Sequence, residues 1–99
     1  MIIVSGYLRV PHERLADLLA VARDTIEATH KEAGCIVYSF AADMVEPGLI
    51  RIYEEWENRA ALDAHGKAPQ MGPWRQKLAE VGVISRQVIA YEAGAPRAL

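Results

Sequence analysis

The sequence is short of cysteine, of basic charge and of long apolar runs. A single cysteine, Cys35, stands among 99 residues and cannot form an internal disulfide, so we expect a reducing, cytoplasmic setting. Eleven Lys and Arg face 13 Asp and Glu, which excludes the basic excess of a dedicated nucleic-acid binder. No apolar run approaches the roughly 20 residues of a membrane helix. The start has four apolar residues without a basic lead, so neither a signal peptide nor a membrane association is expected.

Metal-ligand patterns are absent as well. The three histidines, His12, His30 and His65, have no zinc-ligand spacing, and Cys35 has no cysteine partner. We therefore predict no bound metal. With 52% hydrophobic and 24% charged residues, the composition is that of an ordinary globular domain. We expect one folded unit over residues 1–93, followed by a Gly-Ala-Pro tail at 94–99.

Local patterns place four strands and three helices along the chain. β-branched and aromatic residues favour strands, Pro11 suits a first helical turn, Asn58 is a good N-cap, and Pro47-Gly48 suits a type II turn. The predicted strands are 2–10, 35–42, 49–56 and 83–91; the predicted helices are a long amphipathic one after Pro11 that stops before Gly34, a short one over 59–65 and one over 70–81.

The order β-α-β-β-α-α-β predicts an α+β, ferredoxin-like fold, with an antiparallel four-stranded sheet covered by helices on one face. The strands offer apolar side chains at both parities, such as Tyr38 against Val37 and Ile52 against Tyr53. A half-covered sheet would prefer one polar face. A second copy of the chain is the economical cover, so we predict a homodimer with the two sheets packed face to face.

Three strings resemble one known family. Residues 32–38 read E-A-G-C-I-V-Y, similar to the family's E-x-G-C-x-x-Y; residues 54–57 read E-E-W-E, similar to its E-x-W-x. Residues 61–71 read A-L-D-A-H-G-K-A-P-Q-M, similar to its A-L-x-x-H-x-x-[ST]-P-H-[MF]. Together, in this order and over nearly the whole of residues 1–93, they resemble the antibiotic biosynthesis monooxygenase family of dimeric α/β barrels.

The resemblance implies a homodimer with a pocket between sheet and helices in each subunit. It also implies oxidation of a small electron-rich phenol, quinol or anthrone by O₂ without metal, flavin or haem. Such chemistry needs a dry pocket, a proton acceptor and donors for the developing oxyanion. The chain departs from the pattern at Gln70, where the family has a second histidine; Gln cannot act as a base. The haem-degrading branch uses an asparagine on the first strand, whereas the single asparagine here is Asn58.

His65 and Glu54 are the candidate catalytic residues. His65 is either a general base or a charge at a helix C-terminus. Glu54 shares a strand face with Trp56; burial there would raise its pKa and suit it to proton transfer, unless an arginine or a backbone group pairs with it.

The candidate substrate-binding residues are aromatic: Trp56, Trp74, Tyr7 and Tyr38. Each is either a pocket wall or core packing. Tyr7 and Tyr38 are expected on neighbouring elements, and Trp74 is expected to close the pocket from the helix side. Cys35 is interpreted as a small buried hydrophobe.

Two alternatives compete with an oxygenase. One is an isomerase or other proton-transfer enzyme on the same scaffold, since base chemistry needs the same pocket. The other is a non-catalytic module that binds a small ligand or haem. Fold alone does not decide among them.

Overall fold

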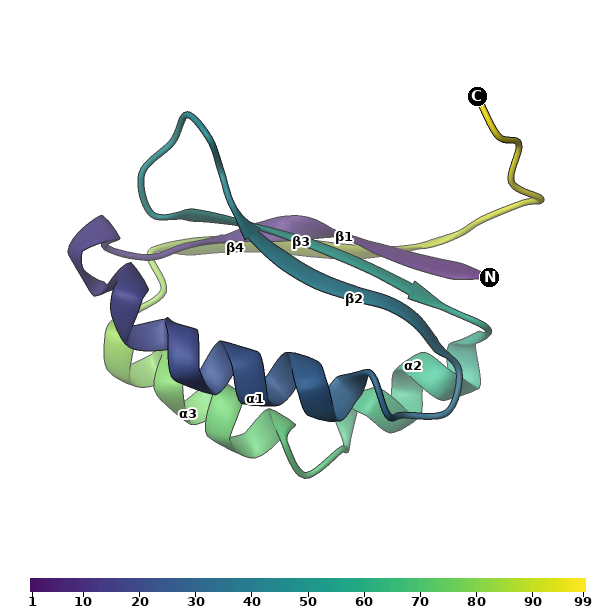
Figure 1. Cartoon of the computed structure of the whole chain (residues 1–99), viewed down its shortest axis with the longest axis horizontal. Helices are drawn as coiled ribbons and strands as arrows, with labels where there is room; N and C mark the ends of the chain where they lie inside the picture. Colours follow the sequence, from purple (N-terminus) through teal and green to yellow (C-terminus); the bar gives the residue numbers. More distant parts are fainter.

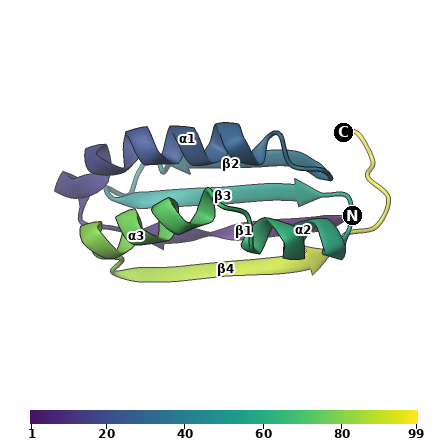
Figure 2. The ribbon, with the colours of Figure 1, turned by 90° about the horizontal axis from the view of Figure 1, so that it is seen from below.

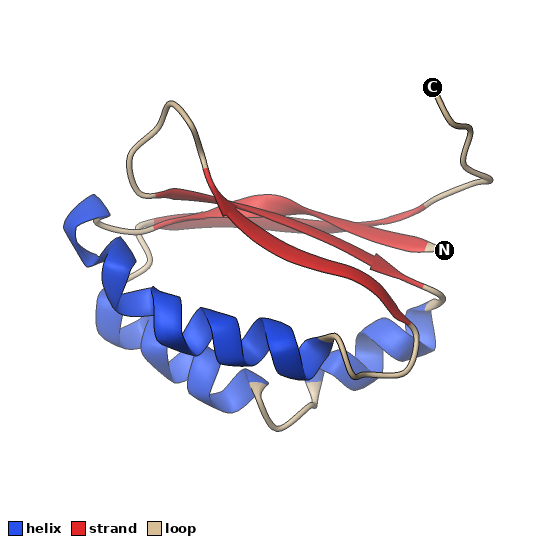
Figure 3. Cartoon of the chain, in the orientation of Figure 1, coloured by secondary structure: helices blue, strands red, loops and turns tan.

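The computed structural model describes all of residues 1–99 as one sheet with helices against one face (Figures 1 and 3). The elements are β1 (Ile2–Arg9), a 3₁₀-helix (His12–Leu18), α1 (Leu19–Thr29), β2 (Cys35–Ala42), β3 (Leu49–Trp56), α2 (Arg59–Gly66), α3 (Met71–Val81) and β4 (Ser85–Glu92). No helix has both the length and the apolar composition to cross a bilayer. The predicted order of elements is confirmed.

The sheet is antiparallel, with the strand order β2-β3-β1-β4. This order confirms the predicted ferredoxin-like α+β fold. Figure 2 shows α1 running along β2 and β3, while α2 and α3 follow one another across β1 and β4. The helices therefore cover one face of the sheet and leave the other face uncovered.

The long helix differs from its prediction at its start. Residues 12–18 form a 3₁₀-helix, and only from Leu19 does the helix become α. Pro11 provides no side-chain cap, and the amide of Arg14 donates to the Pro11 carbonyl at 2.9 Å. Such i→i+3 bonds satisfy the free amides at a helix start that lacks a cap.

The turn and the short helix form as predicted. Gly48 has φ of +79°, and the amide of Leu49 donates to the Glu46 carbonyl, as a type II turn with Pro47-Gly48 at its centre requires. The amide of Ala61 donates to the Asn58 side chain at 2.9 Å, so Asn58 caps α2. The cap fixes where α2 begins and therefore where His65, near its end, lies.

The core lies between the sheet and the helices in two clusters. The larger joins Leu8, Ile50 and Ile52 of the sheet to Trp74 and Leu78 of α3. The smaller contains Ile2, Val4, Tyr38 and Trp56, near the end of the sheet that α2 covers. The smaller cluster contains two of the candidate site residues.

Candidate functional site

A cavity of about 300 Å³ lies between the helix-facing side of the sheet and the end of α2 with the first turns of α3. Most of its lining is apolar, including Val4, Leu8, Ile52 and Val88. Five side chains with titratable groups also line it: Tyr38, Glu54, His65, Arg75 and Arg86. An apolar cavity with a few convergent polar groups is the usual form of a small-molecule site.

His65 is held by Glu32, a residue 33 positions away in the sequence, and Gln70 in turn holds Glu32. Its side chain is buried, and Nδ1 lies 2.7 Å from Oε2 of Glu32, in the loop after α1. The amide of Gln70 donates to the same Glu32 oxygen at 2.8 Å and to Oγ1 of Thr29 at 3.2 Å. Because a carboxylate only accepts, Nδ1 carries the proton, and Nε2 is left as the nitrogen that can accept one.

The loop that carries Glu32 fits closely against α2. Gly34 has φ of +82°, and a Cβ there would collide with the Cβ of Ala61. Only glycine combines this backbone conformation with so close an approach. Gly34 thus lets the chain turn from α1 into β2 directly against α2, which brings Glu32 within reach of His65.

Glu54 is the second buried polar group. Its side chain faces the helices from β3, and Oε1 accepts a hydrogen bond from Nε1 of Trp56 at 2.8 Å. Burial raises the pKa of Glu54 above its ordinary value, while the Trp56 hydrogen bond and the neighbouring His65 oppose the rise. No arginine pairs with it, so the alternative of an ion pair is wrong, and the protonated form is favoured more than in water.

Two aromatic rings lie against these groups. Tyr38 lies opposite Glu54 on the neighbouring strand, with its ring edge-on to His65 at 5.0 Å between centroids. Trp56 is fully buried and also packs against His65, at 4.8 Å between ring centroids. Burial raises the pKa of Tyr38, with Glu54 adding to the effect, so its phenol stays a neutral hydrogen-bond donor.

The structure brings together some of the predicted site residues and separates others. His65, Glu54 and Tyr38 line one cavity, and Trp56 packs behind them. Trp74 lines a different cavity of about 270 Å³, between the first helical segment and β2. The expectation that Trp74 closes the pocket around His65 is therefore not met: its ring stacks on Phe40 at 5.1 Å.

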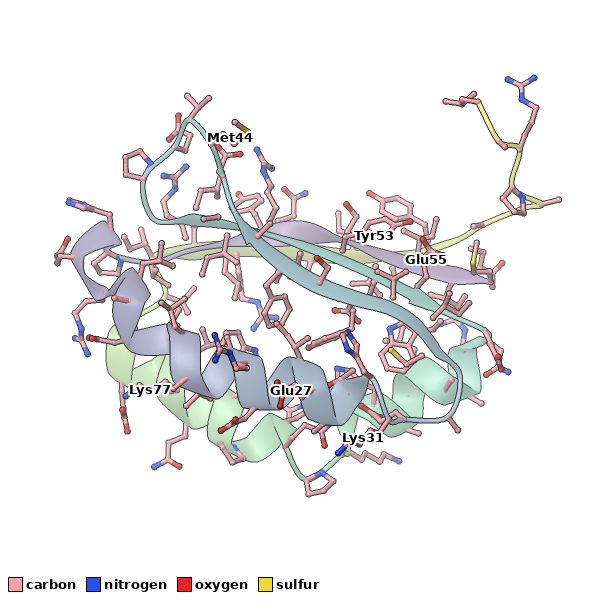
Figure 4. All side chains as sticks on the ribbon, viewed as in Figure 1. Glu27, Lys31, Met44, Tyr53, Glu55 and Lys77 are labelled. Atoms are coloured by element: carbon pink, nitrogen blue, oxygen red, sulfur yellow. The ribbon has the colours of Figure 1, made fainter.

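Tyr7 also lies elsewhere. It pairs with Arg51 and Gln87, on the face that points away from the helices. In Figure 4 this uncovered face of the sheet is marked by the labels of Tyr53 and Glu55. The helix layer lies on the opposite side and is marked by the labels of Glu27, Lys31 and Lys77. The expectation that Tyr7 and Tyr38 lie on neighbouring elements was wrong, because β3 runs between β1 and β2.

Three residues that sequence reasoning gave no part in the site belong to it. Glu32 stood in a motif without a role, Gln70 was interpreted only as a lost histidine, and Arg86 was considered only as a partner for Glu54. The sequence did indicate Arg86: side chains two residues apart on a strand share a face, so Arg86 lies on the same inward face of β4 as Val88 and Ala90.

Cys35 and the other histidines take no part. Burial raises the pKa of the Cys35 thiol, with Glu32 and Glu54 adding to the effect, so the thiolate is disfavoured. His12 and His30 are exposed, and the one site residue that His30 contacts is Tyr38, through the backbone carbonyl at 3.0 Å. No three His, Cys, Asp or Glu side chains come together as a metal-binding cluster.

Comparisons with known proteins agree on the family. The family model described as antibiotic biosynthesis monooxygenase matches residues 1–77. A solved structure from Deinococcus radiodurans, whose name carries the same description, superposes with a TM-score of 0.91 at 30% identity over 100% of this chain and 98% of its own. A conserved Methanosarcina mazei protein superposes with a TM-score of 0.86 at 25% identity over 94% and 92% of the two chains.

A curated relative from Synechocystis, itself uncharacterised, is 31% identical over 91 residues. The match covers 92% of this chain and 62% of the relative. The chain thus spans less than two thirds of that relative's length.

Proposed function

The chain belongs to the antibiotic biosynthesis monooxygenase family, and on that premise we propose that it oxidises a small electron-rich phenol, quinol or anthrone with O₂ in the cavity beside His65. The observation that carries the proposal is the pair formed by His65 and Glu32. A buried imidazole whose Nδ1 is held by a carboxylate presents Nε2 as a base to a mostly apolar cavity.

The proposed reaction begins with loss of a proton from the substrate to Nε2 of His65. The resulting enolate or phenolate is electron-rich enough to give one electron to O₂. The two radicals combine, so that a C–O bond forms to the peroxide. Loss of water then breaks the O–O bond and leaves a carbonyl: a CH₂ group and O₂ become C=O and H₂O. The substrate supplies all the electrons, and the protein handles only protons and charge.

Glu54 and Tyr38 have the complementary role. In its protonated form, which burial favours, the carboxyl group of Glu54 donates a hydrogen bond, as does the neutral phenol of Tyr38. Side by side on β3 and β2, they are suited to stabilising negative charge on the substrate oxygen as it develops. The apolar lining strengthens such hydrogen bonds by keeping water out.

The test is oxygen uptake by metal-stripped protein with a panel of hydroquinones and anthrones, against the panel alone. Protein-dependent uptake with equimolar quinone formation is the expected result. Exchange of the substrate's acidic proton into D₂O without oxygen uptake would instead favour an isomerase. A shifted Soret band on haem titration, with neither activity, would favour a haem-binding module.

We also propose that the protein acts as a homodimer joined through the uncovered face of the sheet. Tyr53, Ile89 and Tyr91 are exposed there. Exposed apolar groups in one patch favour association. Light scattering should give about twice the 10.9 kDa chain mass, and a monomer at micromolar concentration would refute this assembly.

A further inference from the structure

Two arginines from opposite walls reach the cavity that contains His65 and Glu54. Arg75 comes from α3 and Arg86 from β4. Nη2 of Arg75 donates to the Gly66 carbonyl at 2.7 Å, which anchors one N–H and leaves the other donors free. Burial raises the pKa of the Tyr38 phenol, and the positive charge of Arg75 partly opposes this rise. Both arginines are exposed residues that line the cavity, and the Arg75 charge still affects the buried phenol of Tyr38.

Neither arginine has an acidic partner. Four of the chain's other arginines do: Arg9 pairs with Glu46, Arg14 with Asp17, Arg51 with Asp43 and Arg59 with Glu92. The two carboxyl groups nearest the cavity do not compensate. Glu32 is already engaged by His65 and Gln70, and Glu54 accepts from Trp56. The cavity thus has two guanidiniums without a counter-charge.

We propose that the substrate carries a carboxylate, which Arg75 and Arg86 bind while its oxidisable ring lies against His65 and Glu54. A planar guanidinium offers paired N–H donors that match the two oxygens of a carboxylate. The volume of about 300 Å³ is at the small end of ligand cavities, so a compound of one or two rings is the matching size. This inference rests on the proposed function, because it names the charged part of that substrate.

The experiment compares ligands that differ only in this charge. Binding of 2,5-dihydroxybenzoate and of its methyl ester is measured by calorimetry without oxygen, together with the non-phenolic pair 2-naphthoate and methyl 2-naphthoate. Each carboxylate should bind about tenfold more tightly than its ester, the size expected for charge-assisted hydrogen bonds. In the double variant Arg75→Gln/Arg86→Gln this ratio should fall to about one. Each single variant should give a ratio between that of the double variant and that of the parent protein.

Arg23→Gln is the matched control. Arg23 is an exposed arginine without an acidic partner that lines the other cavity, so its loss should leave the ratio unchanged. Arg86→Gln alone keeps the test valid if the loss of the Arg75–Gly66 hydrogen bond unsettles the end of α2. Equal binding of acid and ester, no binding of any probe at millimolar concentration, or loss of the preference in Arg23→Gln would each overturn the inference.

Oxygen uptake with the dihydroxybenzoate pair separates the two proposals. A carboxylate preference that depends on Arg75 and Arg86, without uptake on any phenol, keeps the anion site and rejects the oxygenase. Uptake with neutral quinols and no preference for acids keeps the oxygenase and rejects the anion site.

Discussion

The two cavities of this domain are nearly equal in size and differ in the polar side chains that line them. The cavity beside α1 holds about 270 Å³, and ten of its eleven lining residues are hydrophobic. The cavity beside α2 holds about 300 Å³ and is lined by a histidine, a glutamate, a tyrosine and two arginines as well. Volume therefore does not distinguish the functional site from a gap in packing; the convergence of polar groups does.

One aromatic side chain connects the two cavities. Phe40 lines both, and Trp74, which stacks on it, lines only the apolar one. Trp74 belongs to the larger core cluster, whereas Trp56 belongs to the smaller one around the site. Changes at the cavity beside α1 should accordingly affect stability, and changes at the cavity beside α2 should affect turnover. The predictions that follow test this division.

The largest effect is expected for Trp74→Ala. Truncation removes a buried indole and its stack on Phe40, which typically costs about 3–5 kcal/mol of unfolding free energy. Urea unfolding measures the loss. The milder Trp74→Phe should fold fully and keep turnover close to that of the parent. A folded Trp74→Phe protein without activity would place Trp74 in the substrate site. It would refute the assignment of stability to one cavity and turnover to the other.

His65→Gln should reduce turnover by about 10²-fold or more, because a general base contributes at least that much. In free energy this is about 2.7 kcal/mol of the barrier. Steady-state oxygen uptake measures it, with His12→Gln, an exposed histidine outside the site, as the control. Undiminished turnover in a folded His65→Gln protein would remove His65 from the mechanism.

Glu32 is expected to act through His65 rather than on the substrate. Glu32→Ala removes the acceptor at Nδ1, and loss of such an orienting partner typically costs about 10-fold or more. Glu32→Gln keeps a carbonyl oxygen that can accept from Nδ1–H and should recover part of the rate. Nitrogen-15 spectra of the imidazole report the tautomer directly. If Glu32→Ala leaves the Nδ1–H tautomer and the rate unchanged, Glu32 has only a structural role.

Most of the fold could be predicted because its signals are local. The strands at 35–42 and 49–56 have the predicted bounds, since alternation and the Pro47-Gly48 turn define them. The cap at Asn58 correctly placed the start of α2. The 3₁₀ segment was missed because apolar periodicity does not distinguish i→i+3 from i→i+4 bonding over two turns.

Only part of the site could be predicted, because some of its contacts join residues that are far apart in the sequence. Glu54 and Trp56 are two residues apart, and the strand period places them on one face. Glu32 and His65 are 33 residues apart, and their contact depends on the conformation of Gly34 and on how α2 packs. Tyr7 was misplaced because its strand parity, opposite to that of the buried Leu8, puts it on the uncovered face, and because β3 separates its strand from that of Tyr38.

The smallest effect is expected at Glu54, and it is one of pH. Because burial raises the pKa of Glu54 in the folded state, the native protein binds more protons than the unfolded chain between the two pKa values. Stability therefore falls as pH rises through that range. Glu54→Gln keeps an oxygen to accept from Trp56 but does not ionise. Its Tm should match the parent's at acidic pH and exceed it by a few degrees at neutral pH. A gap that widens toward acid would mean that Glu54 is stabilised as a carboxylate, which would make it a base beside His65 instead of a donor.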